Sequence, residues 1–149
     1  MPYVEVREIV PCSRDKVYPI LKDMEKYPEF MPDLVSVEVL GREGNTTVTK
    51  WVSNVDGRKI SWTERDIFDE AGFRIAYRQI EGDLKKFEGE WILRPLLGNE
   101  KEEATEITLT VDFEFGIPMI AGLLHPILKK KVRENSLNML RAIKEKVTR

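Results

Sequence analysis

The sequence predicts an α+β fold in which a curved antiparallel sheet of about seven strands packs against one long C-terminal helix. Between residues 34 and 115, apolar residues mostly alternate with polar ones, and turn-forming clusters divide the alternation into consecutive strands. After residue 116 the apolar spacing changes to that of a helix. The length of 149 residues fits one domain over residues 1–149.

One strand and two short helices precede that alternating region. Valines alternating with charged residues at the start predict a strand that ends at Pro11. Ser13 can cap a helix over residues 14–25, and Pro19 would distort the first turn of this helix. The Tyr-Pro-Glu-Phe-Met-Pro segment at 27–32 then breaks the helix and leaves room for one short helical turn.

Turn signals divide the alternating region into about six consecutive strands. They lie at residues 41–45, 56–57, 69–72, 81–83 and 98–105. The Asp56-Gly57 pair is the strongest, because both central residues of a two-residue hairpin loop need positive φ. This loop therefore sets the register of the strands on either side of it.

Loop lengths predict which residues oppose each other across neighbouring strands. The two-residue loop places Trp51 opposite Trp62. A four-residue loop next along the chain places Glu64 opposite Tyr77, and a three-residue loop then places Tyr77 opposite Phe87. The three loops put one set of residues on a common inner face: Trp51, Ile60, Trp62, Phe68, Phe73, Ile75, Tyr77, Phe87, Trp91 and Leu93.

The opposite face of the predicted sheet is strongly polar. It carries Lys50, Lys59, Ser61, Arg65, Arg74, Arg78, Lys86 and Glu90. This set belongs in water, so the inner set belongs against the long helix.

Four polar side chains share the inner face with the tryptophans: Glu64, Asp66, Tyr77 and Gln79. Burying a polar group is costly unless it is hydrogen-bonded. One interpretation is a partly hydrated ligand cavity with a few orienting polar groups. The other is that Glu64 and Tyr77 hydrogen-bond each other or lie near the rim.

The C-terminal helix starts at Pro118 and has a distinctive first part. Residues 117–128 are apolar nearly all round, so we expect them to cover the mouth of the cavity. Pro126 should bend or interrupt the helix. Helical spacing continues through Leu124, Leu128, Val132, Asn135, Met139, Ile143 and Val147. The end is rich in Lys and Arg, which suits a solvated helix face and leaves open a protein partner.

Composition excludes several classes of site and partner. Cys12 and His125 are the only cysteine and histidine, too few for a Cys/His zinc site or an internal disulfide. We therefore expect no metal and no cofactor. The net charge of −2 predicts no nucleic-acid partner. Neither a signal peptide nor a transmembrane segment is evident, which predicts a cytoplasmic protein.

Two pairs of motifs carry a resemblance to a known family. The first pair is Val-Tyr-Pro-Ile-Leu-Lys-Asp-Met at 17–24 followed by Glu-Lys-Tyr-Pro-Glu-Phe-Met-Pro at 25–32. The second is Ile-Ala-Tyr-Arg-Gln at 75–79 with Phe-Glu-Gly-Glu-Trp at 87–91. With these motifs the chain resembles the START-like helix-grip superfamily, and within it the polyketide cyclase/dehydrase and coenzyme Q-binding group.

The resemblance implies a hydrophobic cavity between sheet and helix that holds a small apolar ligand. Members of the superfamily bind quinones or lipids, cyclise and aromatise polyketides, or, in one branch, act as a ribosome-associated toxin. The inner face and the resemblance together predict these ligand-binding residues: Trp51, Trp62, Glu64, Phe73, Ile75, Tyr77, Gln79, Phe87, Trp91, Phe113, Met119, Leu123 and Ile127.

Three functions remain open at this point: a non-catalytic carrier, favoured first, then a cyclase or dehydratase, then a protein-partner module. An enzyme needs an acid–base pair at the ligand, for which Glu64 and Tyr77 are the candidates. The resemblance implies cavity Arg, Tyr and Trp side chains in aromatising members. Trp62 and Tyr77 match that set, but the register places Arg65 on the outer face.

Overall fold

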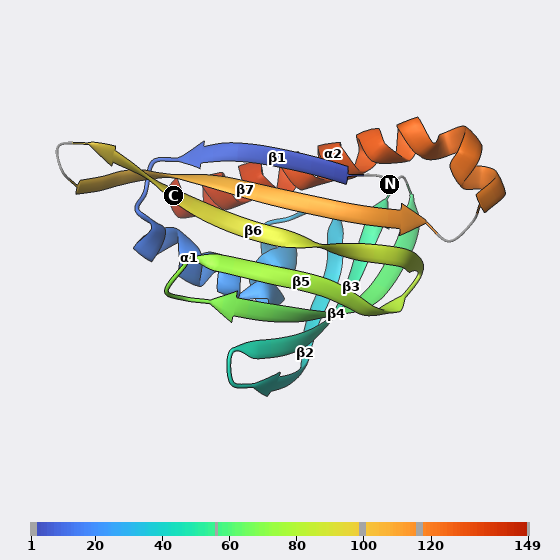
Figure 1. The fold of residues 1–149 in the computed structure, drawn as a ribbon, viewed down its shortest axis with the longest axis horizontal. Helices are drawn as coiled ribbons and strands as arrows, with labels where there is room; N and C mark the ends of the chain where they lie inside the picture. Colours follow the sequence, from blue (N-terminus) through green and yellow to red (C-terminus); the bar gives the residue numbers. More distant parts are fainter. Residues whose placement is uncertain (1–2, 56, 99–100, 116–117, 149) are drawn as a thin grey trace.

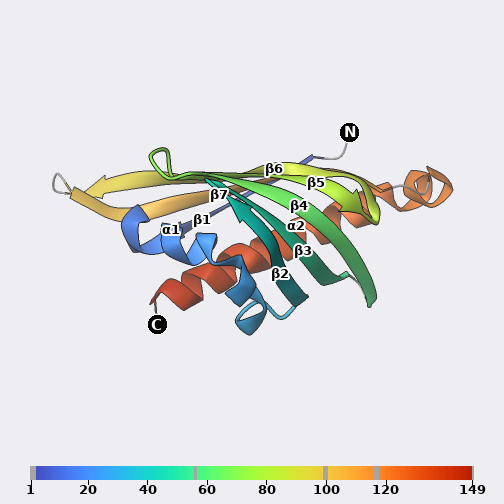
Figure 2. The same ribbon diagram turned by 90° about the horizontal axis from the view of Figure 1, so that it is seen from below.

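In the computed structural model, seven strands form one antiparallel sheet in the order β1-β7-β6-β5-β4-β3-β2. The strands are β1 (Tyr3–Val10), β2 (Leu34–Glu43), β3 (Thr46–Val55), β4 (Arg58–Asp69), β5 (Arg74–Gly82), β6 (Leu84–Gly98) and β7 (Lys101–Phe115). The long helix α2 (Pro118–Thr148) crosses the concave side of the curved sheet, behind it in Figure 1 and below it in Figure 2. This is the helix-grip arrangement that the sequence predicts.

The structure describes residues 3–55, 57–98, 101–115 and 118–148. Within these ranges, the side chains of residues 55, 58, 101–103, 115 and 118–128 lie outside the description. The predicted cover over the cavity at residues 117–128 and the predicted bend at Pro126 therefore fall outside the described residues. Among the helices of the described part, none is long and apolar enough to cross a membrane.

Two short helices follow β1, as predicted, but their boundary differs from the prediction. Helix α1 (Arg14–Lys22) ends early, where the N–H of Asp23 bonds the carbonyl of Pro19. A 3-10 helix, η1 (Met24–Glu29), follows directly and contains Pro28. Proline fixes φ near −65°, a value that a 3-10 helix accepts, so Pro28 does not end the helical path.

The register between β3 and β4 matches the prediction. Trp51 lies opposite Trp62, and Thr49 lies opposite Glu64. The two indole rings stack with their centroids 5.7 Å apart and their planes 9° apart. The Asp-Gly hairpin signal therefore identified both the pairing and the shared face of the tryptophans.

The next two registers are each displaced by two residues from the prediction. Glu64 pairs with Gln79 rather than with Tyr77. Tyr77 pairs with Gly89 rather than with Phe87. Because side chains alternate with a period of two, this even displacement changes the partners of Glu64 and Tyr77 but leaves both on their predicted face. A bulge between Thr63 and Glu64 shifts the register once more, so that Trp62 pairs with Gly82.

Contacts outside the loops explain both displacements. The loop between β4 and β5 lies at residues 70–73, because Phe73 adopts a positive φ of 53°. Its ring packs edge-on against Tyr18 of α1, with the ring centroids 5.5 Å apart. After β5, Asp83 is tied to β4: its carboxylate accepts from the N–H of Ser61 at 2.8 Å, and its own N–H donates to the Ser61 carbonyl at 2.9 Å.

Burial confirms the two predicted faces of the sheet. The inner tryptophans, Ile75 and Leu93 are buried, with Ile75 completely inaccessible. On the outer face, Arg74 and Arg78 are exposed and form ion pairs with Glu90 and Glu88 of β6. The core therefore lies between the concave face and α2.

Candidate functional site

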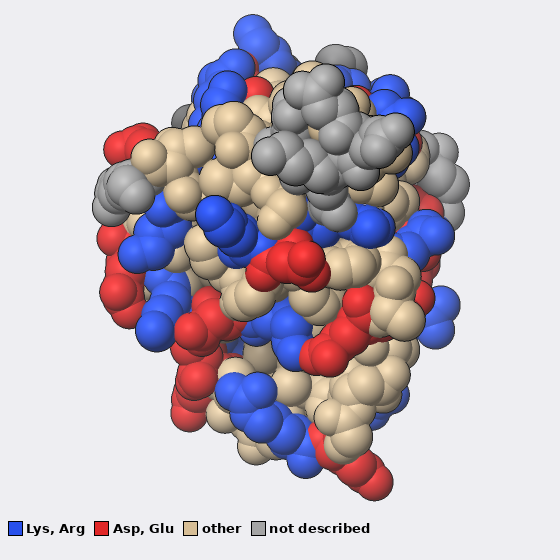
Figure 3. Space-filling view, turned by 90° about the vertical axis from the view of Figure 1, so that its left-hand side faces the viewer, with Lys and Arg blue, Asp and Glu red and all other residues tan. Residues whose placement is uncertain are grey.

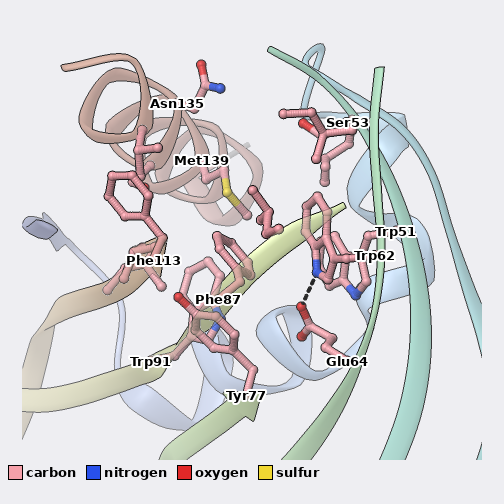
Figure 4. A pocket seen from close by; sticks show the side chains of 17 residues that line it. Trp51, Ser53, Trp62, Glu64, Tyr77, Phe87, Trp91, Phe113, Asn135 and Met139 are labelled. Carbon is pink, nitrogen blue, oxygen red and sulfur yellow. Dashed lines mark hydrogen bonds between the residues drawn. The ribbon is translucent and has the colours of Figure 1, made fainter. Parts of the chain in front are cut away.

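A cavity of about 100 Å³ lies between the concave face of the sheet and α2 (Figure 4). Strands β2 to β7 form most of its wall, and the described part of α2 closes one side. The lining residues are Leu34, Trp51, Ser53, Ile60, Trp62, Glu64, Tyr77, Leu84, Phe87, Trp91, Leu109, Val111, Phe113, Val132, Asn135, Ser136 and Met139.

Many of the predicted site residues lie in this wall. The cavity brings together Trp51, Trp62, Glu64, Tyr77, Phe87, Trp91 and Phe113. They belong to five different strands, β3 to β7, and meet because alternation and the parity of the registers put them on one face. The predicted Met119, Leu123 and Ile127 fall outside the described side chains.

Three predicted residues lie elsewhere among the described residues. Phe73 belongs to the loop between β4 and β5, where the guanidinium of Arg14 lies 4.1 Å from its ring centroid. Ile75 is completely buried in the core and does not reach the cavity. Gln79 turns its amide toward the backbone and donates to the carbonyl of Leu84 at 2.7 Å. Alternation identifies a face, but not how far along that face a cavity extends.

Sequence reasoning missed four site residues further along the helix than those it named. Val132, Asn135, Ser136 and Met139 line the cavity from α2. Three of them, Val132, Asn135 and Met139, belong to the series with helical spacing in the sequence, so this series could have identified them. Helical spacing does not show how the helix is rotated about its axis over the sheet, and that rotation decides which residues line the cavity.

Aromatic rings form one continuous wall of the cavity. The ring of Phe87 lies 4.9 Å from that of Trp62, measured between centroids. Tyr27 of η1 supports the wall from behind, with its ring edge-on to Trp51 at 5.7 Å and to Trp91 at 6.2 Å. Tyr27 belongs to the Tyr-Pro motif on which the resemblance rests, and its role here is to hold two tryptophans of the wall in place.

Glu64 is the acidic residue in the described wall, and it is only 3% exposed. Its Oε1 accepts a hydrogen bond from the indole Nε1 of Trp62 at 2.7 Å, the dashed line in Figure 4. Asp66, also buried, follows two residues later on the same face of β4. Two buried carboxyl groups therefore share one polar pocket behind the aromatic wall.

Asp66 is completely buried and supported by threonine hydroxyls. Its Oδ2 accepts from Oγ1 of Thr49 at 2.6 Å and from Oγ1 of Thr47 at 3.3 Å. Its Oδ1 has no amide or hydroxyl donor among the described residues. A proton on the neighbouring Glu64 is therefore the partner available to Asp66 Oδ1.

Burial raises the pKa of Glu64 well above its ordinary value, and hydrogen bonding with Asp66 and the charge of Asp66 raise it further. Burial also raises the pKa of Asp66, but hydrogen bonds from Glu64 and the two threonines act in the opposite direction. Two adjacent buried carboxyl groups cannot both be charged at neutral pH. We therefore assign the proton to Glu64 and the single negative charge to Asp66.

The hydroxyl of Tyr77 does not reach Glu64. It donates to the carbonyl oxygen of Thr110 on β7 at 2.7 Å. Burial raises the pKa of Tyr77 well above its ordinary value, and the nearby acidic groups raise it further. The interpretation in which Glu64 and Tyr77 hydrogen-bond each other is wrong, and only the ring of Tyr77 is directed to the ligand space.

Comparison with known families places the chain. The sequence model of the family described as polyketide cyclase/dehydrase and lipid transport matches residues 10–140. The chain belongs to this family. Its cavity between sheet and helix is that of a hydrophobic-ligand-binding helix-grip fold, as the resemblance implied.

Individual relatives in this family have different names. The chain is 27% identical over 143 residues to the ribosome association toxin RatA of Escherichia coli K12, covering 95% of this chain and 84% of that protein. The crystal structure of TTHA0849 from Thermus thermophilus has a TM-score of 0.90 and 31% identity, covering 99% of this chain and 97% of that one. The Zhui aromatase/cyclase from Streptomyces sp. R1128 has a TM-score of 0.88 and 28% identity, with 99% and 93% covered.

Proposed function

We propose that this chain is a cytoplasmic protein that binds one small, largely apolar molecule between the sheet and α2 and releases it chemically unchanged. The observation that carries the proposal is the cavity itself. Its described wall is mostly aromatic and aliphatic, and its polar members are Glu64, Ser53, Asn135 and Ser136. Apolar walls with a few convergent polar groups are typical of ligand pockets.

The chemistry of the wall supports a carrier over a cyclase or dehydratase. None of the described lining residues is an Arg, Lys or His. Arg65, the arginine next to the site in sequence, is exposed on the outer face of the sheet. The hydroxyl of Tyr77 is occupied by Thr110. A general acid and base must both lie within hydrogen-bond reach of the substrate, and the described wall supplies one carboxyl group for both roles.

The size of the cavity supports a compact ligand. An apolar cavity of about 150 Å³ in another protein binds benzene. At about 100 Å³, this cavity accepts at most one ring without movement of its wall. A larger quinone or polyketide-like ligand would enter by displacing side chains of α2.

Native mass spectrometry of the purified protein tests the proposal, because it detects a co-purified molecule and its mass. We expect an apolar ligand to quench tryptophan fluorescence, since Trp51, Trp62 and Trp91 line the cavity. It should also raise the melting temperature, because a ligand at a hundredfold excess over Kd adds about 2.7 kcal/mol to the free energy of unfolding. Recovery of a cyclised or dehydrated product from the wild type, but unchanged substrate from Glu64→Gln, would instead establish an enzyme.

Ribosome association is a second candidate function, supported by the similarity to RatA over 95% of this chain. The described end of α2 offers exposed cations for it, among them Lys129, Lys130, Arg133 and Arg141. On the side that Figure 3 shows, basic and acidic side chains are intermixed rather than gathered into one patch.

Co-sedimentation with purified ribosomal subunits tests this second function. We expect the double substitution Lys129→Glu and Lys130→Glu to weaken co-sedimentation at least several-fold, because two exposed cations are reversed. Lys59→Glu, an exposed cation on the outer face of β4, is the matched control. Equal co-sedimentation of all three proteins would exclude this part of α2 as the contact.

A further inference from the structure

The hydrogen-bonding groups of Glu64 determine what a ligand meets at the polar end of the cavity. One oxygen already accepts from the indole N–H of Trp62 at 2.7 Å. On the same face of β4, the buried Asp66 has an Oδ1 with no hydrogen-bond donor among the described residues, so a proton on Glu64 has an acceptor there. What Glu64 can still offer to the cavity is therefore lone pairs and not a proton.

The neighbouring groups reinforce this directionality. Thr49 receives the indole N–H of Trp51 at 2.7 Å and passes its own hydroxyl hydrogen to Asp66 at 2.6 Å. The indole donor of each stacked tryptophan is thus consumed inside the wall. Tyr77 likewise gives its hydroxyl hydrogen to Thr110. Four donors near the polar end of the cavity are therefore already engaged and point away from a ligand.

We propose that the cavity selects small aromatic molecules that donate a hydrogen bond, such as phenols and arylamines, over molecules of equal size that only accept one. This inference rests on the proposed function, since it names the class of ligand for the same site. The donor of the ligand bonds a free lone pair of Glu64, while its ring lies against the wall formed by Trp62 and Phe87.

The charge of the acid pair adds a second element of selectivity. Glu64 and Asp66 together retain one negative charge in a buried setting. No cation belongs to the described part of the wall. A ligand carboxylate would bring a second negative charge close to the first without a partner, which is costly in a site with little water. The cavity therefore excludes aromatic acids and fatty acids.

Four single-ring probes separate these possibilities: phenol, benzaldehyde, benzoate and toluene. Binding is followed by calorimetry and by the indole N–H resonances of the tryptophans. Phenol and benzaldehyde have similar size and polarity, but phenol donates and benzaldehyde only accepts. We expect phenol to bind the wild type about tenfold more tightly than benzaldehyde, a difference of about 1.4 kcal/mol. Benzoate should not bind measurably.

Glu64→Gln tests the role of the carboxyl group without changing its shape. The amide oxygen can still accept from Trp62, and one amide hydrogen can still donate to Asp66. The second amide hydrogen then faces the cavity, so benzaldehyde should gain affinity and the tenfold preference should fall to about threefold or less. Glu90→Gln, the same change on the outer face of β6, should leave the preference at its wild-type value.

The outcomes distinguish this inference from the proposed function. If toluene binds and benzaldehyde binds as tightly as phenol, the donor selectivity is wrong while the carrier function stands. If none of the four probes binds, both proposals fail at this cavity. If Glu64→Gln does not fold, the ratio of phenol to benzaldehyde affinity in the wild type decides alone.

Discussion

At the scale of single residues, Glu64 and Asp66 make folding depend on a proton. The folded protein holds one proton between two buried carboxyl groups, whereas an unfolded chain releases both protons near their ordinary pKa values. The folded state therefore binds more protons than the unfolded state at neutral pH. By linkage, stability falls as the pH rises through this range.

Glu64→Gln should remove this part of the pH dependence. The pKa of Glu64 is raised, so its contribution to stability is complete below 4.5, its ordinary value, and is lost as pH rises through the folded value. Within that window the wild type loses up to about 1.4 kcal/mol per pH unit. In urea denaturation from about pH 5 to about pH 8, the unfolding free energy of the variant should fall less than that of the wild type. Parallel curves would contradict the assignment of the proton to Glu64.

Gly89 is the residue that lets Tyr77 reach across the sheet. A Cβ atom at this position would lie 1.9 Å from the carbonyl oxygen of Thr110 and 2.7 Å from the hydroxyl of Tyr77. Gly89→Ala should therefore destabilise the protein by about 1–3 kcal/mol, measured by chemical denaturation. Gly41→Ala is the control, since nothing lies within 4 Å of its Cβ, and it should stay within about 0.5 kcal/mol of wild type. Equal effects of the two substitutions would contradict the close approach at Gly89.

At the scale of elements, η1 acts as a support for the cavity wall. Tyr27 is completely buried, and its hydroxyl donates to the carbonyl of Leu21 in α1 at 2.5 Å. The same ring packs against Trp51 and Trp91. One side chain thus joins the end of α1 to two strands that lie apart in the sheet, β3 and β6.

Tyr27→Phe separates the two contributions of this side chain. The ring contacts remain, but a buried carbonyl loses its donor, which should cost about 1–3 kcal/mol of unfolding free energy. Tryptophan emission of the folded protein should stay unchanged because the aromatic contacts persist. Tyr3→Phe, at an exposed tyrosine, is the control and should have no measurable effect on stability. If the Tyr27→Phe protein is as stable as wild type, the hydroxyl of Tyr27 does not contribute to stability.

The strands show what the sequence could and could not predict. Alternation and the Asp-Gly turn predicted the faces of the sheet and the Trp51–Trp62 pair, because both depend on local backbone chemistry. The partner of Glu64 could not be predicted, since that register depends on Phe73 packing against α1. Alternation also placed Glu64 and Asp66 on the inner face. Their hydrogen-bond partners could not be predicted, because these depend on the neighbouring strands.

At the scale of the whole molecule, the distance between sheet and helix sets the volume of the cavity. The sheet contributes the rigid aromatic wall, and α2 contributes the half-buried Val132, Asn135 and Met139. Met is unbranched and adaptable, so the helix side of the cavity is the side that can change its shape most easily. Ligand size should therefore be controlled from α2.

Met139→Ala should enlarge the cavity at a modest cost in stability. Burial of Met139 is partial, so we expect a loss of about 2 kcal/mol, the lower end for Met→Ala changes in protein cores. Naphthalene, a two-ring probe, should then bind more tightly relative to toluene than it does in the wild type. Arg141→Ala, an exposed position on the same helix, should leave this ratio unchanged. If naphthalene gains nothing, α2 does not limit ligand size.

The pairing of β1 with β7 has a consequence for folding during synthesis on the ribosome. Val4 pairs with Val111, and Val10 with Thr105. The strand that pairs with β1 is therefore synthesised roughly 100 residues after it. The hairpins from β2 to β6 join neighbours in the chain and can form as they emerge. Translation at about 5–20 residues per second leaves β1 unpaired for roughly 5–20 seconds. The seven-stranded sheet is therefore complete only when the two ends of the nascent chain meet, and until then β1 is an unpaired strand exposed to aggregation.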